Sequence, residues 1–238
     1  VETTSREAVT SLLSMDKYID VIIPRGGKGL IEKIIKYSKI PMIKHLDGNC
    51  HVYIDKSAQK QKAINISINS KTQRYGVCNA METLLIHKNF SKTATQEILS
   101  KFLELGVKIK GCNSTKKLNK KVIRASENDW YEEYLAPIVA VKIVKNIDEA
   151  IIHIQKYGSM HTDAIISSDK QAIDKFTKLV NSSSVMVNTS TRFADGYEYG
   201  LGAEIGISTD KLHARGPVGL DGLTNLKYIV TSLGKVRN

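Results

Sequence analysis

The chain has 238 residues, of which 42% are hydrophobic, 25% are charged and only 6% are aromatic. This composition suffices for a packed core and excludes a disordered chain, and no run of about 18 apolar residues occurs that would predict a membrane-spanning helix. The formal charge of +11 comes from lysines spread along the chain without interleaved aromatic residues, so we interpret it as surface composition and expect no nucleic-acid partner.

The first residues lack the basic and then apolar layout of a signal peptide, so a cytoplasmic location is expected. The three cysteines are too few and too scattered for a disulfide framework, and they form no CxxC pair that would suggest zinc. Because the sequence begins without Met and its first βαβ unit starts almost at once, we expect that an upstream segment is missing.

The first predicted element is a short strand at 20–24, followed by a glycine turn at 25–29 and a helix over 30–35. A turn signal at 46–49 then precedes a second strand at 51–54. The opening of the chain is therefore predicted to be a βαβ unit, which indicates a parallel sheet.

Three later helices are predicted because apolar residues recur at i, i+3, i+4 and i+7. In the clearest one Asn146 is the expected N-cap, Asp148 and Glu149 lie in the first turn, and Gly158 is expected to end the helix in the left-handed conformation. The predicted apolar faces are Ile147, Ala150, Ile151 and Ile154; Ala172, Ile173, Phe176 and Val180; and Ile98, Phe102 and Leu105 before Gly106.

Between the helices lie short β-branched runs at 82–86, 138–144, 164–166 and 185–188, each typical of a buried strand. A further helix is expected to end near Gln73. Strands alternate with helices and no internal repeat is found, so the chain is predicted to be a continuous α/β unit.

Cys78 follows a glycine-containing stretch between a predicted helix and a predicted strand. A loop on a rigid scaffold is where a reactive thiol would be placed, and Lys71 and Arg74 are candidate sources of the positive potential that a thiolate needs. The alternative is a small buried hydrophobic residue, which is what most free cysteines are. Cys50 and Cys112 lie beside or within predicted strands, and we interpret both as structural.

The stretch formed by Arg25, Gly26, Gly27, Lys28 and Gly29 suits phosphate oxygens, because glycine permits close approach and the following helix presents free N–H groups. It is neither a GxGxxG fingerprint nor a P-loop, and a tight strand-to-helix turn with two surface cations remains the alternative.

The other candidate site residues are histidines and arginines. His45 and His51 lie on different sides of a turn, so the six histidines predict no metal cluster. Arg192 and Arg215 lie in irregular, glycine-rich stretches, where each is a candidate clamp for a carboxylate or phosphate, although a surface arginine is the commoner outcome.

Five segments taken together resemble the γ-glutamyl phosphate reductases, also called glutamate-5-semialdehyde dehydrogenases. They are IPRGGKGLI at 23–31, PMIKHLDGNCHVYID at 41–55, KTQRYGVCNAMETLL at 71–85, TRFADGYEYGLGAEIGIST at 191–209 and HARGPVGLDGLT at 213–224. They occur in the family's order, and the chain corresponds to roughly the C-terminal half of the family's protein.

The resemblance implies the aldehyde dehydrogenase-like α/β fold. On it, residues 1–55 are the end of a Rossmann-like cofactor domain, 56–205 are the α/β catalytic domain, and 206–238 return to the cofactor domain and supply a strand for homo-oligomers. The family's upstream dinucleotide-binding strands and oxyanion-hole asparagine have no counterpart in the chain, so activity without the N-terminal half is in doubt.

The resemblance also implies an activity: NADPH-dependent reduction of L-glutamyl 5-phosphate to L-glutamate 5-semialdehyde through a thioester on Cys78, in proline biosynthesis, with glutamate 5-kinase as the pathway partner. Residues 25–28 are implied to lie near the adenosine and phosphate end of NADP, and Glu133 to hold the nicotinamide ribose. His45 occupies the place of the glutamate that activates water in aldehyde-oxidising members. A backbone N–H at Cys78 or Asn79 is the local candidate for an oxyanion donor.

Three alternatives stay open. The chain is an inactive, truncated remnant of the family, or it is a different aldehyde dehydrogenase relative, which should carry glutamate in place of His45 if it is hydrolytic. The third, an RNA-binding module, is disfavoured because the lysines are not interleaved with aromatic residues.

Overall fold

A seven-stranded sheet forms the centre of the computed structural model, which describes residues 2–211 and 214–237 except for the side chains of Arg6 and Lys28. Every strand pair in it is parallel, and the strand order is β4-β3-β5-β2-β1-β6-β7. The α/β class with a parallel sheet is therefore confirmed. The strands are β1 (Cys50–Ile54), β2 (Met81–His87), β3 (Lys108–Gly111), β4 (Ile123–Arg124), β5 (Ile138–Val144), β6 (Thr162–Ile166) and β7 (Ser184–Val187).

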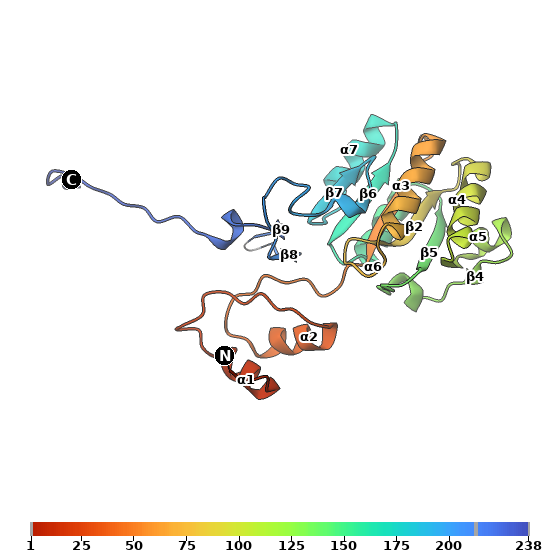
Figure 1. The fold of residues 1–238 in the computed structure, drawn as a ribbon. Coiled ribbons are helices and arrows are strands. Elements are labelled where there is room, and N and C mark those ends of the chain that lie inside the picture. The colour runs from red at the N-terminus through yellow and green to blue at the C-terminus, as the bar shows by residue number, and fades with distance from the viewer. Residues whose placement is uncertain (1, 212–213, 238) are drawn as a thin grey trace.

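Helices cover both faces of this sheet (Figure 1). Alternate strand residues point to opposite faces, so Leu84 packs into one core and Leu85 into the other. All residues of β1 and β2 are buried, as expected for central strands with helices on each side. One layer holds α3 (Lys60–Thr72), α4 (Lys92–Glu104) and α5 (Asn113–Leu118), and the other holds α6 (Ile147–Tyr157) and α7 (Lys170–Leu179).

The predicted βαβ opening is wrong in its second strand. Ile22 pairs in parallel with Met42, not with residues 51–54, and α2 (Lys28–Tyr37) connects the two. The Ile22 N–H donates to Pro41 O at 2.9 Å, and the Ile43 N–H donates to Ile22 O at 2.9 Å. This pairing is a single bridge, because Pro41 has no N–H to extend the ladder. α1 (Arg6–Leu12) precedes it and was not predicted.

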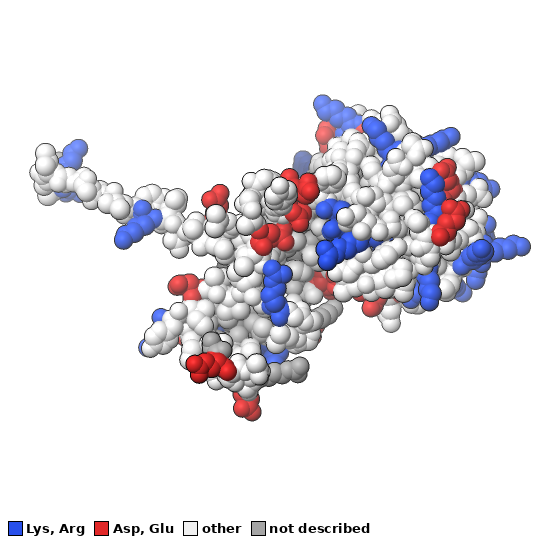
Figure 2. Space-filling view, viewed as in Figure 1, with Lys and Arg blue, Asp and Glu red and all other residues white. Residues whose placement is uncertain are grey.

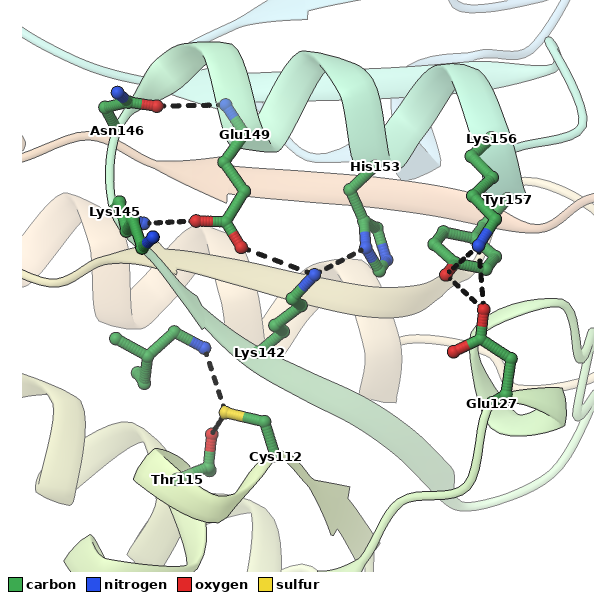
Figure 3. A network of polar contacts seen from close by, with 11 residues as sticks. Cys112, Thr115, Glu127, Lys142, Lys145, Asn146, Glu149, His153, Lys156 and Tyr157 are labelled. Carbon is green, nitrogen blue, oxygen red and sulfur yellow. Dashed lines mark hydrogen bonds and ion pairs between the residues drawn. The ribbon is translucent and has the colours of Figure 1, made fainter.

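Most predicted elements in the sheet region are confirmed. Asn146 caps α6, with its side chain accepting from the Glu149 N–H at 3.0 Å (Figure 3). Two details are wrong. Gly158 ends α6 in an extended conformation with φ −72°, and it is suited to the position because a Cβ there would lie 2.6 Å from Ile154 O. Leu105 is 52% exposed, because α4 ends at Glu104, and Leu99 is buried in its place.

Short 3-10 helices and a small hairpin complete the fold. The 3-10 helices are η1 (Asn128–Trp130), η2 (Thr191–Phe193) and η3 (Asp221–Leu223), and β8 (Gly206–Ser208) pairs in antiparallel fashion with β9 (Gly216–Val218). Residues 224–237 leave the body as an extended tail (Figure 1). More than four-fifths of each of its large apolar side chains is exposed: Leu226, Tyr228, Ile229, Val230, Leu233 and Val236.

The charged surface carries both signs. On the face seen in Figure 2, lysine and arginine side chains are scattered over the sheet region with acidic side chains among them. This distribution fits the interpretation of the positive charge as surface composition rather than a nucleic-acid footprint. None of the helices in the described part of the chain has the length and apolar character needed to cross a bilayer.

Candidate active site

The candidate site lies at the amino ends of the central strands. Asn49 directly precedes β1, Cys78 lies in the turn before β2, and His161 directly precedes β6. Because these strands are parallel and adjacent, the segments before them meet at one edge of the sheet. Cys78 is half-buried there, as the loop argument predicts.

A cavity of about 490 Å³ opens beside Cys78. It brings together several residues that were predicted as site residues from distant parts of the sequence. The lining residues that come from that set are Gly26, Gly27, His45, Cys78 and Glu133. The thiol of Cys78 thus shares this cavity with three other segments: the glycine turn before α2, the loop before β1 and the segment before β5.

Backbone contact fixes the loop before β1 against the Cys78 turn. A Cβ on Gly48 would lie 1.9 Å from Cys78 O, so no other residue fits without moving one of the two segments. The Gly48 N–H donates to Glu133 Oε1 at 2.8 Å. Gly48 therefore contacts both the backbone of the Cys78 turn and the carboxylate of Glu133.

The thiol of Cys78 is not activated in this state. Burial, followed by the negative charges of Glu133 and Glu204, raises the pKa of Cys78 to about 11. Its own backbone N–H and the guanidinium of Arg192 oppose the shift. The positive potential at Cys78 therefore comes from Arg192, which sequence reasoning had considered only as a substrate clamp.

Lys71, one of the two predicted sources, is paired with a buried carboxylate. It is fully buried and its Nζ lies 2.5 Å from Glu82 Oε2. Burial lowers the pKa of Lys71 and raises the pKa of Glu82 to about 7, while the ion pair opposes both shifts. Glu82 Oε1 also accepts from the Leu135 N–H at 3.3 Å. The pair therefore supports the segment before β5 rather than the thiol.

Two histidines lie beside Cys78. The His45 Nδ1–H donates to Ile207 O at 3.1 Å, and the ring of His45 meets the ring of His161 edge-on at 5.3 Å. Burial, with a contribution from His45, lowers the pKa of His161 to about 3. The prediction of no metal cluster rested on the separation of His45 from His51, and nothing in the structure tests it; His45 lies against His161 instead, and this pair together with Cys78 makes a group of possible metal ligands.

Sequence reasoning missed His161 altogether. The available signal was its position three residues before the predicted strand at 164–166, which is similar to that of Cys78, four residues before the predicted strand at 82–86. That signal is useful only when β6 is known to lie two strands from β2, with β1 between them. Side-chain proximity across a sheet depends on strand order, which the local sequence does not encode.

The remaining predicted site residues are more dispersed. Asn79 is buried, and its Nδ2 donates to Ala194 O at 3.0 Å, so its side chain holds the turn to the segment after η2. The Arg25 guanidinium donates to Ile205 O. Arg192 Nε donates to Gln73 Oε1 at 2.8 Å.

Arg215 lies on a different cavity. That cavity, of about 390 Å³, is lined by residues of the 200–201 and 214–222 segments. The guanidinium of Arg215 donates to the side chain of Asn181 at 3.3 Å. The structure therefore does not bring it to Cys78. The side chain of Lys28 and all of His213 lie outside the described residues.

The two other cysteines make local contacts. The Cys50 Sγ donates to Cys78 O at 3.2 Å, and burial raises its pKa well above the usual value. Cys112 Sγ accepts from the Ile143 N–H at 3.4 Å and lies 3.3 Å from Thr115 Oγ1 (Figure 3). These contacts fit the interpretation of both as structural.

Comparison with known proteins identifies the family. No family model matches the chain. The solved structure of γ-glutamyl phosphate reductase from Thermotoga maritima has a TM-score of 0.97 and 43% identity; the match covers 100% of this chain and 57% of that protein. The enzyme of the same name from Saccharomyces cerevisiae has a TM-score of 0.52 and 39% identity, over 84% of this chain and 49% of the yeast protein.

A more distant likeness shows the fold alone. An acetylating aldehyde dehydrogenase from Geobacillus thermoglucosidasius has a TM-score of 0.68 and 21% identity, over 98% of this chain and 61% of that protein. The aldehyde dehydrogenase-like fold is thereby confirmed. The chain belongs to the γ-glutamyl phosphate reductase family, and it spans 57% of the length of the Thermotoga maritima member.

Proposed function

We propose that the chain carries the catalytic centre for NADPH-dependent reduction of L-glutamyl 5-phosphate to L-glutamate 5-semialdehyde and phosphate, a step of proline biosynthesis in the cytoplasm. One observation carries the proposal. A half-buried cysteine shares a single cavity with a glycine turn at a helix N-terminus and with Glu133. The substrate would come from a glutamate 5-kinase, because an acyl phosphate is what such a kinase makes.

The chemistry begins at Cys78. Its thiolate attacks the acyl carbon, the C–O bond to phosphate breaks, and phosphate leaves with that electron pair, which yields a thioester. When held by residues 25–28 and Glu133, NADPH would supply the hydride that reduces the thioester carbon. The tetrahedral adduct on Cys78 then collapses, which releases the aldehyde and restores the thiolate. A backbone N–H at Cys78 or Asn79 is the proposed donor to the adduct's oxyanion.

The glycine turn fits the phosphates of a dinucleotide. A Cβ on Gly27 or Gly29 would meet no atom within 4 Å, so open space adjoins the backbone there. Gly27 is the N-cap of α2 and makes no side-chain cap, which leaves the first N–H groups of the helix available to an anion. A cavity of about 620 Å³ between α1 and α2 also borders Gly26 and Gly27. Residues 25–28 would hold the phosphate and adenosine end, and Glu133 the ribose.

Substrate contacts are proposed for His45 and Arg192. Arg192 is near enough to Cys78 to lower its pKa, which suits an anion held beside the thiol. His45 lines the same cavity in the place where hydrolytic relatives carry a glutamate base. Without that base, phosphate rather than water exchanges with the thioester. The test is the rate of thioester hydrolysis in the His45→Glu variant. A rate no higher than that of the unaltered chain would count against this role.

Arg215 and the C-terminal tail are proposed to act at a distance from this cavity. Arg215 would hold a substrate or phosphate anion only if its cavity forms part of the complete protein's site. The tail exposes several large apolar residues along an extended backbone, which suits pairing with a second copy of the chain. Removal of residues 225–238 is expected to reduce a homo-oligomer to a smaller species on size-exclusion chromatography.

The domain boundaries stay a proposal. Residues 1–55 would complete a cofactor domain, 56–205 form the catalytic domain, and 206–238 return to the cofactor domain. The bridge at Ile22 and the hairpin β8–β9 lie outside the seven-stranded sheet, which supports the outer parts of this division. The sheet itself spans 50–187 and takes its strand β1 (Cys50–Ile54) from the first of the three ranges.

The direct test is NADP-dependent and phosphate-dependent oxidation of L-glutamate 5-semialdehyde, followed by absorbance of the reduced cofactor. It compares this chain with a version that is extended upstream to the length of its relatives. Activity of the extended version is expected to vanish in Cys78→Ala and to persist in Cys112→Ala, which removes the other half-buried thiol. A folded extended protein without activity would point to an inactive remnant instead.

A further inference from the structure

Three side chains that ligate metals meet beside the Cys78 cavity. One donor atom from each of His45, Cys78 and His161 lies within 4.8 Å of the other two. The residues come from three segments: the loop before β1, the turn before β2 and the residue before β6. The three side chains therefore come together only in the folded chain. A metal ion bound by them would stabilise the native state over the unfolded one.

Each imidazole has its Nδ1 next to an oxygen atom. The His45 Nδ1–H donates to Ile207 O at 3.1 Å, and His161 Nδ1 lies 2.8 Å from Thr162 Oγ1. His161 is 0% exposed, and its Nε2 has no hydrogen-bond partner among the described residues. An oxygen partner at Nδ1 with Nε2 left over is the arrangement that orients a histidine toward a metal.

We propose that Nε2 of His45, Nε2 of His161 and Sγ of Cys78 bind a zinc ion. A thiolate with two imidazoles is a typical donor set for tetrahedral zinc, and three protein ligands leave the fourth position open to water. Ordinary zinc bond lengths set ligand atoms about 3.4–3.6 Å apart. The 4.8 Å spread must then contract by about 1.2–1.4 Å, which rotation of the half-buried side chains of His45 and Cys78 would supply while the backbone contact at Gly48 is kept.

Binding has a defined stoichiometry. The S–H bond of Cys78 breaks, the sulfur keeps the electron pair and bonds to zinc, and one proton passes to the buffer. The sulfur's electron pair is then committed, so zinc blocks the nucleophile reversibly and a chelator restores it. The site shares its sulfur with the proposed reductase reaction, but zinc binding does not depend on that reaction.

Calorimetric titration of the reduced chain with zinc chloride tests the proposal. The titration is run in two buffers of different ionisation enthalpy, so that the number of released protons can be determined. One zinc per chain and release of one proton are expected. Cys78→Ser, His45→Gln and His161→Gln are each expected to weaken binding by at least about tenfold, and Thr162→Val by about tenfold through the lost Nδ1 partner. Cys112→Ser is the matched control with unchanged affinity, since it alters a half-buried thiol away from the group.

Alkylation by iodoacetamide, followed by peptide mass spectrometry, gives a second readout that needs no enzyme activity. Zinc is expected to protect Cys78 and not Cys112. Circular dichroism separates lost binding from lost folding, and the half-buried His45→Gln variant serves if His161→Gln does not fold. Binding that survives both Cys78→Ser and His45→Gln, or zinc that leaves alkylation of Cys78 unchanged, would overturn the proposal even in a chain with no reductase activity.

Discussion

At the scale of single residues, the pKa of Cys78 depends first on burial, which raises it, and then on a balance of neighbouring charges. Glu133 and Glu204 disfavour its thiolate, while Arg192 favours it. A carboxylate that is proposed to bind the cofactor's ribose thus also keeps the thiol protonated in this state. Any ligand that neutralises or covers Glu133 would shift this balance toward the thiolate.

Charge-removing variants of these neighbours are expected to shift the pKa of Cys78 in opposite directions. Glu133→Gln removes a negative charge and lowers the pKa from about 11, whereas Arg192→Gln raises it. The measurement is the rate of Cys78 alkylation against pH in a Cys112→Ser background, where the rate should climb by about tenfold per pH unit below the pKa. A plateau near neutral pH, or shifts of the same sign in both variants, would contradict this electrostatic account.

At the scale of elements, helices and central strands were predictable because their signals are local. The apolar face of α6 and its Asn146 cap lie within one continuous segment, and the β-branched run at 138–144 matches β5 residue for residue. The polar strand β3 was missed because Lys108 and Lys110 alternate with Ile109 in a run too short to show a pattern. The bridge partner of Ile22 was missed because pairing is a tertiary property.

The loop before β1 offers a test of how elements hold the site. Gly48→Ala places a Cβ where Cys78 O lies, 1.9 Å away, so one of the two segments must move. We expect a loss of about 1–3 kcal/mol in the free energy of unfolding, together with a changed alkylation rate at Cys78.

Gly76→Ala is the matched control for this loop. Gly76 lines the same cavity, but a Cβ there would meet no atom within 4 Å. Chemical denaturation of the two variants makes the comparison. Equal stability of both variants would show that the contact between Gly48 and Cys78 does not hold the site.

At the scale of the whole molecule, the candidate site is assembled from segments that the sequence keeps far apart. The resemblance to a family identified Cys78, His45 and Glu133, and the fold places all three on one cavity. The local sequence did not show that His161 meets Cys78, because that contact follows from strand order. It also did not show that Arg215 lies on another cavity, because the place of Arg215 follows from the hairpin β8–β9. Local patterns therefore predicted the elements, and only tertiary structure gave their meeting point.

Buried histidines also set how the whole molecule responds to acid. Burial, with electrostatic contributions from His51, Lys142 and Lys156, lowers the pKa of His153 to about 2, and the Lys142 ammonium donates to its Nδ1 at 3.3 Å (Figure 3). The folded chain therefore keeps His153 neutral, while the unfolded chain takes up a proton near its usual pKa of 6.5. Stability from the neutral form is fully present above that pKa and falls as the pH drops below it.

Urea unfolding between pH 7.5 and 4.5 measures this effect. Below pH 6.5, each histidine that the fold keeps neutral adds up to about 1.4 kcal/mol per pH unit to the slope of the free energy of unfolding against pH. His153→Gln should reduce this slope by that amount, whatever the substitution does to stability at pH 7.5. His161→Gln should act in the same direction, because the pKa of His161 is lowered to about 3. A slope that neither variant changes would mean that the unfolded chain gains no more protons at these positions than the folded one, and that carboxylates alone govern acid unfolding.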